Sequence, residues 1–217
     1  SDHLLCIGAQ ALDLGGFTAF LYAFYQREVI YDIYETVSGQ RFHPSYTRVG
    51  GLLFDVNEDF ISKVRQFLKG FPKAYADVTR LLNRNRIFIE RTRGIGVLPK
   101  DLAINLSCTG PIARASGVTR DLRKDEPFLA YGELQGAFQV VCSAEGDCYA
   151  RYQVRMEEML ESAKIIAAAI ENLPAGPVNV DNGKISGPDQ LAVYRSIESL
   201  IHHFELVMPN RQWTPPV

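Results

Sequence analysis

The residues best suited to chemistry lie in the stretch GQRFHPSYTRVGGL, residues 39–52. It holds His43, two arginines and a Gly-Gly pair between segments of helical pattern. Pro44 follows the histidine and favours an extended backbone at His43. An imidazole titrates near neutral pH and responds to nearby charge. Two interpretations follow: a loop that holds His43 beside a charged partner, or an ordinary surface loop with a hydrogen-bonded histidine.

A second group of candidates consists of arginines, which gather in NRNRIFIERTRG and in the loop after it: Arg84, Arg86, Arg91, Arg93, Arg114, Arg120 and Arg123. If residues 57–91 form a helix, Arg84 and Arg91 share one face, because they are seven residues apart. Clustered guanidinium groups bind carboxylates and other anions. The alternative is a solvated helix end, where cations favour the negative end of the helix dipole.

Asp13 is the only formally charged residue between Leu4 and Tyr25. A carboxylate in an apolar helix needs a partner or a raised pKa, which indicates a polar cavity or proton handling. The alternative is an aspartate that faces water at a helix bend. About 20 apolar residues would suffice for a membrane span. The aspartate, other polar residues and three glycines instead favour a buried helix of a soluble protein.

No metal site is predicted from the remaining histidines and cysteines. His202 and His203 are adjacent, so on a helix they point about 100° apart and packing is the favoured role. The four cysteines, at positions 6, 108, 142 and 148, have neither C-x-x-C nor zinc-type spacing, which favours reduced thiols. With 23 basic and 25 acidic residues, the net charge of −2 argues against a dedicated nucleic-acid binder. No phosphate-loop or dinucleotide motif occurs.

The elements that must position these residues are mainly helical. Apolar periodicity predicts helices over residues 2–37, 57–91, 147–172 and 189–206. In the first three, the positions predicted to share one apolar face are Leu4, Ile7, Ala11, Leu14, Thr18 and Leu21; Val64, Phe67, Phe71, Tyr75, Val78 and Leu82; and Tyr152, Met156, Met159, Ala163, Ile166 and Ile170. We expect a bend at Gly15-Gly16 and a kink or break at Pro72. Short strands are expected around 41–42 and 52–54, and residues 94–131 read as irregular. The predicted fold is mainly α: one domain over residues 1–217, a bundle of about four long helices with an irregular region and short β-hairpin elements.

Six stretches in this order together resemble the D-subunit family of NADH-quinone oxidoreductase, the hydrogenase-like large subunit of respiratory complex I: ALDLGG, REVIYDIYETVSGQRFHPSYTRVGG, NRIFIERTRGIGVL, GPIARASGVTRDLRKDEPF, GDCYARYQVRMEEM and SIESLIHHF. They extend over nearly the whole chain. The resemblance implies a fold like that of nickel-iron hydrogenase large subunits. Family members continue on both sides of the matching region, so we expect the chain to be the central fragment of a longer subunit.

The resemblance also implies roles for three residues. The family's subunit packs against a partner that carries the terminal iron–sulfur cluster, and quinone binds between the two. His43 is then expected beside that cluster, coupling its reduction to proton uptake, and Arg91 is expected to approach the cluster as well. Reduction adds negative charge, which raises the proton affinity of a nearby imidazole. Asp13 is expected to line the quinone region.

The implied function is that of an enzyme-complex component without a directly bound cofactor or metal. NAD binding and quinone binding belong to the whole oxidoreductase, so the isolated fragment is expected to be inactive. The resemblance implies that the chain lies in the peripheral arm, at the cytoplasmic face of the bacterial inner membrane or on the mitochondrial matrix side. Its expected partners are other peripheral-arm subunits, and no nucleic acid is expected among them. Two alternatives stay open: the large subunit of a membrane-bound nickel-iron hydrogenase relative, or a non-catalytic helical scaffold.

Overall fold

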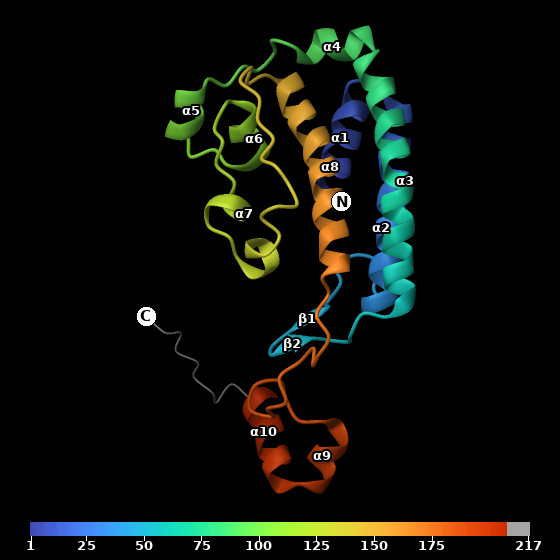
Figure 1. Ribbon diagram of the computed structural model, residues 1–217, viewed down its shortest axis with the longest axis vertical. Helices are drawn as coiled ribbons and strands as arrows, with labels where there is room; N and C mark the ends of the chain where they lie inside the picture. The colour runs from blue at the N-terminus through green and yellow to red at the C-terminus, as the bar shows by residue number, and fades with distance from the viewer. Residues whose placement is uncertain (208–217) are drawn as a thin grey trace. The chain divides into compact units, whose positions relative to one another are not determined.

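Helices dominate the computed structural model, which describes residues 1–207 (Figure 1). This confirms the predicted mainly α class, and residues 208–217 lie outside the described part. The helices are α1 (Asp2–Asp13), α2 (Phe17–Ser38), α3 (Glu58–Asn83), α4 (Arg86–Thr92), α5 (Lys100–Asn105), α6 (Gly110–Ala115), α7 (Leu122–Asp125), the 3-10 helix η1 (Leu129–Gly132), α8 (Cys148–Glu171), α9 (Gln190–Arg195) and α10 (Ile197–Val207). Strands β1 (Thr47–Arg48) and β2 (Gly51–Leu52) form the two-stranded sheet. Within residues 1–207, no helix combines the length and the apolar character that crossing a membrane requires.

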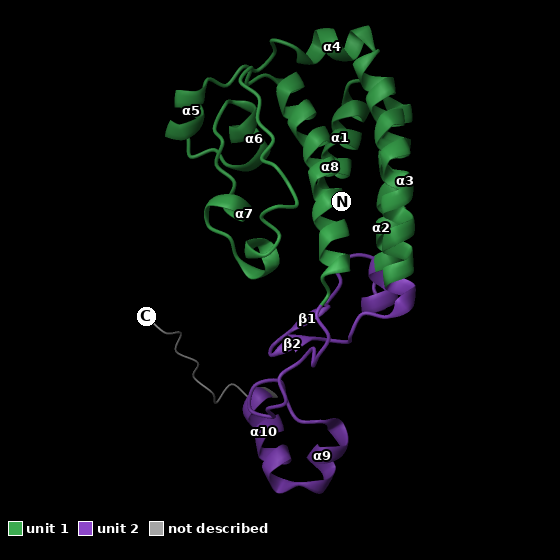
Figure 2. Cartoon of the chain, in the orientation of Figure 1, with its two compact units in different colours: residues 1–33, 61–173 green, residues 34–60, 174–217 purple. Residues whose placement is uncertain are grey.

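The chain divides into two compact units, coloured separately in Figure 2. Unit 1 comprises residues 1–33 and 61–173, and unit 2 comprises residues 34–60 and 174–217. Each unit is therefore built from two stretches that are distant in sequence. The expectation of a single domain over residues 1–217 stays a prediction.

The first predicted helix is two helices, α1 and α2. At the junction Gly15 adopts a φ of 88°, and the Gly16 N–H donates to the Ala11 carbonyl. Before the junction the predicted apolar face is buried, at Leu4, Ile7 and Ala11. After it the prediction is wrong: Thr18 and Leu21 are exposed, whereas Ala19 and Ala23 are buried. The break resets the helical phase, so that a different face of the chain meets the core.

The second predicted helix runs through Pro72 without a break and ends earlier than expected, at Asn83. Pro72 is exposed, and the predicted apolar stripe packs into the core and holds the helix: Val64, Phe67, Phe71, Tyr75, Val78 and Leu82. Helix α4 then starts anew, because the side chain of Asn85 caps it by accepting from the N–H of Phe88 at 3.2 Å. Arg84 and Arg91 consequently do not share one helix, which corrects the face predicted for them.

The core of unit 1 lies among α1, α2, α3, α4 and α8, as the bundle in Figure 1 illustrates. Its largest fully buried side chain is Tyr152 of α8. The bounds of α8 match the prediction, because Asp147 caps its start through a 2.6 Å hydrogen bond from the Ala150 N–H. The predicted seam is buried at Tyr152, Met156 and Met159, whereas Ile166 is exposed.

The region expected to be irregular, residues 94–131, contains the short helices α5, α6 and α7. Helix α6 packs against the side of α8 (Figure 1). Ala115 of α6 forms a small buried cluster there with Ala150 and Val154 of α8. The irregular region is therefore anchored on the opening turns of α8.

Unit 2 contains the hairpin and the last two helices. Strand β1 lies at Thr47–Arg48, so the strand expected around 41–42 is wrong, whereas β2 overlaps the second predicted strand at Leu52. The last predicted helix is divided at Ser196, whose backbone is extended. Its hydroxyl accepts from the N–H of Ser199 and so caps α10, which explains the division.

Candidate functional site

Asp13 is the last residue of α1, at the junction with α2. Its side chain is exposed and has no hydrogen-bond or ion-pair partner within residues 1–207. Gly15 and Gly16 end the helix directly after it, which is why the carboxylate sits at a bend. Of the two interpretations from the sequence, the exposed aspartate at a helix bend describes its position in this chain.

Arg91 lies in the last turn of α4 and is exposed, again without a partner among the described residues. Its neighbours are engaged: Arg86 pairs with Glu90 at 2.7 Å, and the guanidinium of Arg93 lies 4.8 Å from the ring centre of Tyr149. Phe88 and Thr92 turn to the core and fix the orientation of α4. Within the described chain, Arg91 is therefore a free guanidinium on a well-anchored turn.

The end of α1 and helix α4 lie at the same end of the unit 1 bundle (Figure 1). Helix α8 begins at this end too, where the carboxylate of Asp147 accepts from the Gly94 N–H at 2.7 Å. A carboxylate and a guanidinium, at Asp13 and Arg91, are thus exposed at one end of unit 1. Presented charges of this kind are suited to contact a molecule outside the chain.

His43 lies in unit 2, in the loop between α2 and β1. It is exposed, and its ring centre is 3.8 Å from that of Phe42. Its φ is 54°, so the expectation that Pro44 keeps this residue extended is wrong. The loop is held on both sides, because the Ser45 N–H donates to the Gln40 side chain and the Tyr46 hydroxyl donates to the Phe54 carbonyl. His43 and Arg91 belong to different units, and their common approach to a cluster stays a prediction.

A buried charge network in unit 1 was missed by sequence reasoning. The Nε of Arg114 donates to the Glu158 carboxylate of α8 at 2.7 Å, and both side chains are almost fully buried. The second oxygen of Glu158 contacts the His3 ring at 2.7 Å, and Asp121 lies 3.8 Å from Arg114. The available signal was Glu158 itself, an acidic residue between the apolar seam positions Met156 and Met159.

The network shifts the pKa values of its carboxylates. Hydrogen bonds from Arg123 are the largest cause of the lowered pKa of Asp121. Burial alone would raise the pKa of Glu158, but hydrogen bonds from His3 and Arg114 outweigh it and lower that pKa. Both carboxylates therefore stay ionised and fix the guanidinium groups around them.

The arginines of the loop are consequently not a positive surface for an anionic partner, as the sequence had suggested. Arg114 forms its ion pair with Glu158. Arg123 pairs with Asp121 at 2.6 Å, and Arg120 pairs with Glu126 at 2.8 Å. Of the arginines considered, Arg84 and Arg91 are the exposed ones without a partner in the described chain.

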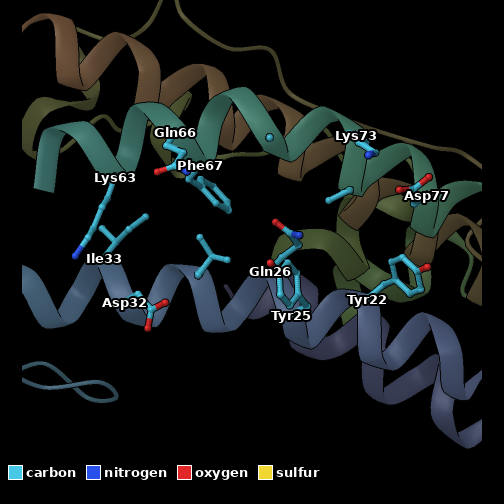
Figure 3. A pocket seen from close by; sticks show the side chains of 13 residues that line it. Tyr22, Tyr25, Gln26, Asp32, Ile33, Lys63, Gln66, Phe67, Lys73 and Asp77 are labelled. Atoms are coloured by element: carbon cyan, nitrogen blue, oxygen red, sulfur yellow. The ribbon is translucent and has the colours of Figure 1, made fainter. Parts of the chain in front are cut away.

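Two larger cavities of unit 1 contain none of the three predicted site residues. One, of about 590 Å³, lies between α2 and α3, where Lys63 of α3 extends toward α2 beside Ile33 (Figure 3). The other, of about 700 Å³, lies by α5 to α7 and is lined by Cys108, Arg114 and Asp121 among others. Within residues 1–207, no three His, Cys, Asp or Glu side chains are grouped so as to hold a metal ion. The candidate site is thus a set of exposed side chains rather than a pocket.

Comparison with known proteins gives a consistent assignment. The family model described as respiratory-chain NADH dehydrogenase, 49 kDa subunit, matches residues 13–216. The D 2 subunit of NADH-quinone oxidoreductase from Sinorhizobium medicae is 46% identical over 207 residues, which are 95% of this chain and 51% of that protein. The D subunit from Ehrlichia ruminantium is 44% identical over 94% of this chain and 52% of its own length. The D 1 subunit from Chloroherpeton thalassium is 46% identical over 94% of this chain and 46% of its own length.

The chain thus spans about half the length of the curated relatives that it matches. The match nevertheless begins at Asp13 and includes His43 and Arg91. It confirms the resemblance that the six ordered motifs indicated. The chain belongs to the family of the 49 kDa subunit of respiratory-chain NADH dehydrogenase.

Proposed function

We propose that this chain is part of the D subunit of NADH-quinone oxidoreductase and acts in electron transfer to quinone. The observation that carries the proposal is the identity of about 45% to D-subunit proteins over 95% of the chain. The chain supplies helices and charged side chains and binds no cofactor itself. NADH oxidation belongs to the complex, so the purified chain alone has no NADH–quinone activity.

Within the complex, the chain packs against the subunit that carries the terminal iron–sulfur cluster. The exposed apolar side chains of α9 and α10 support such packing, because large exposed apolar surfaces mark interaction sites: Leu191, Tyr194, Ile197, Ile201 and Phe204. Docking on a neighbouring subunit would remove these side chains from water. The complex holds the chain in its peripheral arm, at the cytoplasmic face of the bacterial inner membrane or the matrix side of the mitochondrial one.

His43 and Arg91 are the residues that act on the cluster, and Asp13 belongs to the quinone region. Exposure of all three side chains supports roles toward groups held by another polypeptide. Reduction of the cluster adds negative charge, so an imidazole beside it gains proton affinity and a guanidinium favours the reduced state. His43 therefore couples electron uptake to proton uptake, and Arg91 sets the potential by a fixed charge.

The test replaces His43 by methionine in the whole complex and measures the potential of the terminal cluster at several pH values. Without the imidazole, the potential becomes less dependent on pH, because no proton follows the electron at this place. His203→Met is the matched control, since His203 is also exposed, and it leaves the slope unchanged. An unchanged slope in the His43 variant would reject the role of this residue.

A further inference from the structure

Three polar side chains at the contact of α3 with α8 each bury an atom that has no hydrogen-bond partner in the described chain. The atoms are Thr79 Oγ1, Asn83 Oδ1 and the Tyr152 hydroxyl oxygen. A buried polar atom without a partner costs stability, and such atoms are rare in folded proteins. Three of them from adjoining helices call for a common explanation.

All three side chains line one cavity, of about 40 Å³, together with Tyr75, Gln153, Met156 and Glu157. Tyr75, Thr79 and Asn83 are spaced by four residues and therefore lie on one face of α3. Tyr152 is 1% exposed, and its ring packs on Phe88 and Tyr149 with centre distances of 5.1 and 5.7 Å. These contacts keep the Tyr152 side chain in place at the cavity.

The size and the polarity of the cavity decide what fits. A water molecule needs roughly 10–15 Å³ and two to four polar partners, whereas small-molecule sites occupy roughly 300–1,000 Å³. Burial raises the pKa of Tyr152, so that its hydroxyl keeps its proton and acts as a donor. The Tyr152 hydroxyl as donor, the Asn83 oxygen as acceptor and the Thr79 hydroxyl as either can then fill three of the four hydrogen-bonding positions of a water molecule.

We propose that the cavity between α3 and α8 is a binding site for ordered water, held by Thr79, Asn83 and Tyr152. At least one molecule accepts a hydrogen bond from Tyr152 and donates to Asn83, and Thr79 completes its coordination. The water takes the place of a direct contact between the two longest helices of unit 1 and satisfies their buried polar atoms.

The first test is the melting temperature of Tyr152→Phe in this chain. If water is bound, the change removes a partner of that water and lowers the melting temperature, by roughly 2–4 °C for each kcal/mol lost. If the cavity is dry, the change deletes an unpaired buried hydroxyl and raises the melting temperature. The sign thus separates the two cases. Tyr25→Phe, at a side chain that is 67% exposed, is the control and leaves the temperature unchanged.

A second variant and a direct observation complete the test. Thr79→Val keeps the shape of the side chain and removes its hydroxyl, so a bound water again predicts a lower melting temperature. A crystal structure of the chain at a resolution that shows solvent should contain a density peak about 2.7–3.2 Å from the Tyr152 hydroxyl oxygen. A cavity without density, or a raised melting temperature in either variant, overturns the proposal.

Discussion

The ion pair between Arg114 and Glu158 is the charge contact most isolated from water in unit 1, with side chains that are 8% and 4% exposed. Glu158→Gln keeps the shape of the side chain and leaves the guanidinium without its closest counter-charge. Removing one partner of a buried pair typically costs about 3–5 kcal/mol. We expect about 3 kcal/mol here, since Asp121 remains 3.8 Å from Arg114. Urea unfolding measures the change.

The matched control is Glu90→Gln, which breaks the pair with Arg86 at the same 2.7 Å distance. Both of those side chains are exposed, so solvent screens the interaction and the loss is at most about 0.5 kcal/mol. Equal losses in the two variants would mean that burial of the Arg114–Glu158 pair has no energetic consequence.

The same carboxylates predict how stability depends on pH. The pKa values of Asp121 and Glu158 are lowered from 3.8 and 4.5 in the folded chain, so both groups bind protons more readily when unfolded. Their contribution is complete above the unfolded pKa values and is lost as the pH falls through the folded ones. The free energy of unfolding should therefore fall steeply below about pH 4. Asp121→Asn should flatten this acid slope, and an unchanged slope would assign it to other groups.

At the residue scale, the sequence indicated which charged residues could take part in binding, but not which of them form ion pairs within the chain. Exposure of Asp13 at a helix bend was one of the two interpretations that the sequence left open. Burial of Arg114 did not follow, because its partner Glu158 is 44 positions away in sequence. Local patterns carry no information on a contact that only the packing of α6 against α8 creates.

At the scale of elements, α8 was predictable and the hairpin was not. Helix α8 has its cap, Asp147, and its apolar seam within its own sequence. The hairpin depends on residues far along the chain, since the Leu52 N–H donates to the Val178 carbonyl and the Val180 N–H donates to the Gly50 carbonyl. Gly50 and Gly51 permit this close contact with residues 178–180, but in the sequence alone a glycine pair indicates only a turn.

Gly51→Ala tests that approach. A Cβ atom at Gly51 would lie 2.2 Å from the Val178 carbonyl oxygen and 2.7 Å from the Asn179 Cα, so the two backbones must separate. The two hydrogen bonds at Leu52 and Val180 are then lost, at a cost of about 1–3 kcal/mol. Amide exchange measured by NMR should show reduced protection at both residues.

Gly39→Ala is the control for the strained backbone alone. Gly39 also has a positive φ, of 67° against 153° at Gly51, but no atom lies within 4 Å of an added Cβ. The change then lowers the free energy of unfolding only through the left-handed conformation, by roughly 1–2 kcal/mol. Protection at Leu52 and Val180 should stay as in the unchanged chain. Loss of protection in both variants would show that close packing at Gly51 is not the cause.

At the scale of the whole molecule, apolar burial is divided unequally between the two units. Every member of the two buried core clusters belongs to unit 1. In the described part of unit 2, Val37 is the single buried apolar side chain. Since burial of apolar area is the main stabilising term, unit 2 has little of its own to hold it folded.

Amide hydrogen exchange followed by mass spectrometry at increasing urea concentration tests this inequality in the unchanged chain. Peptides from residues 39–57 and 175–207 should exchange through openings of low free energy, because few apolar contacts oppose their opening. Peptides from α3 and α8 should exchange only near global unfolding, because their buried seams lie in the unit 1 core. If both sets of peptides lost protection together, the two units would form one cooperative structure. Protection of α9 and α10 that rises on mixing with the proposed partner subunit would identify the surface that stabilises unit 2.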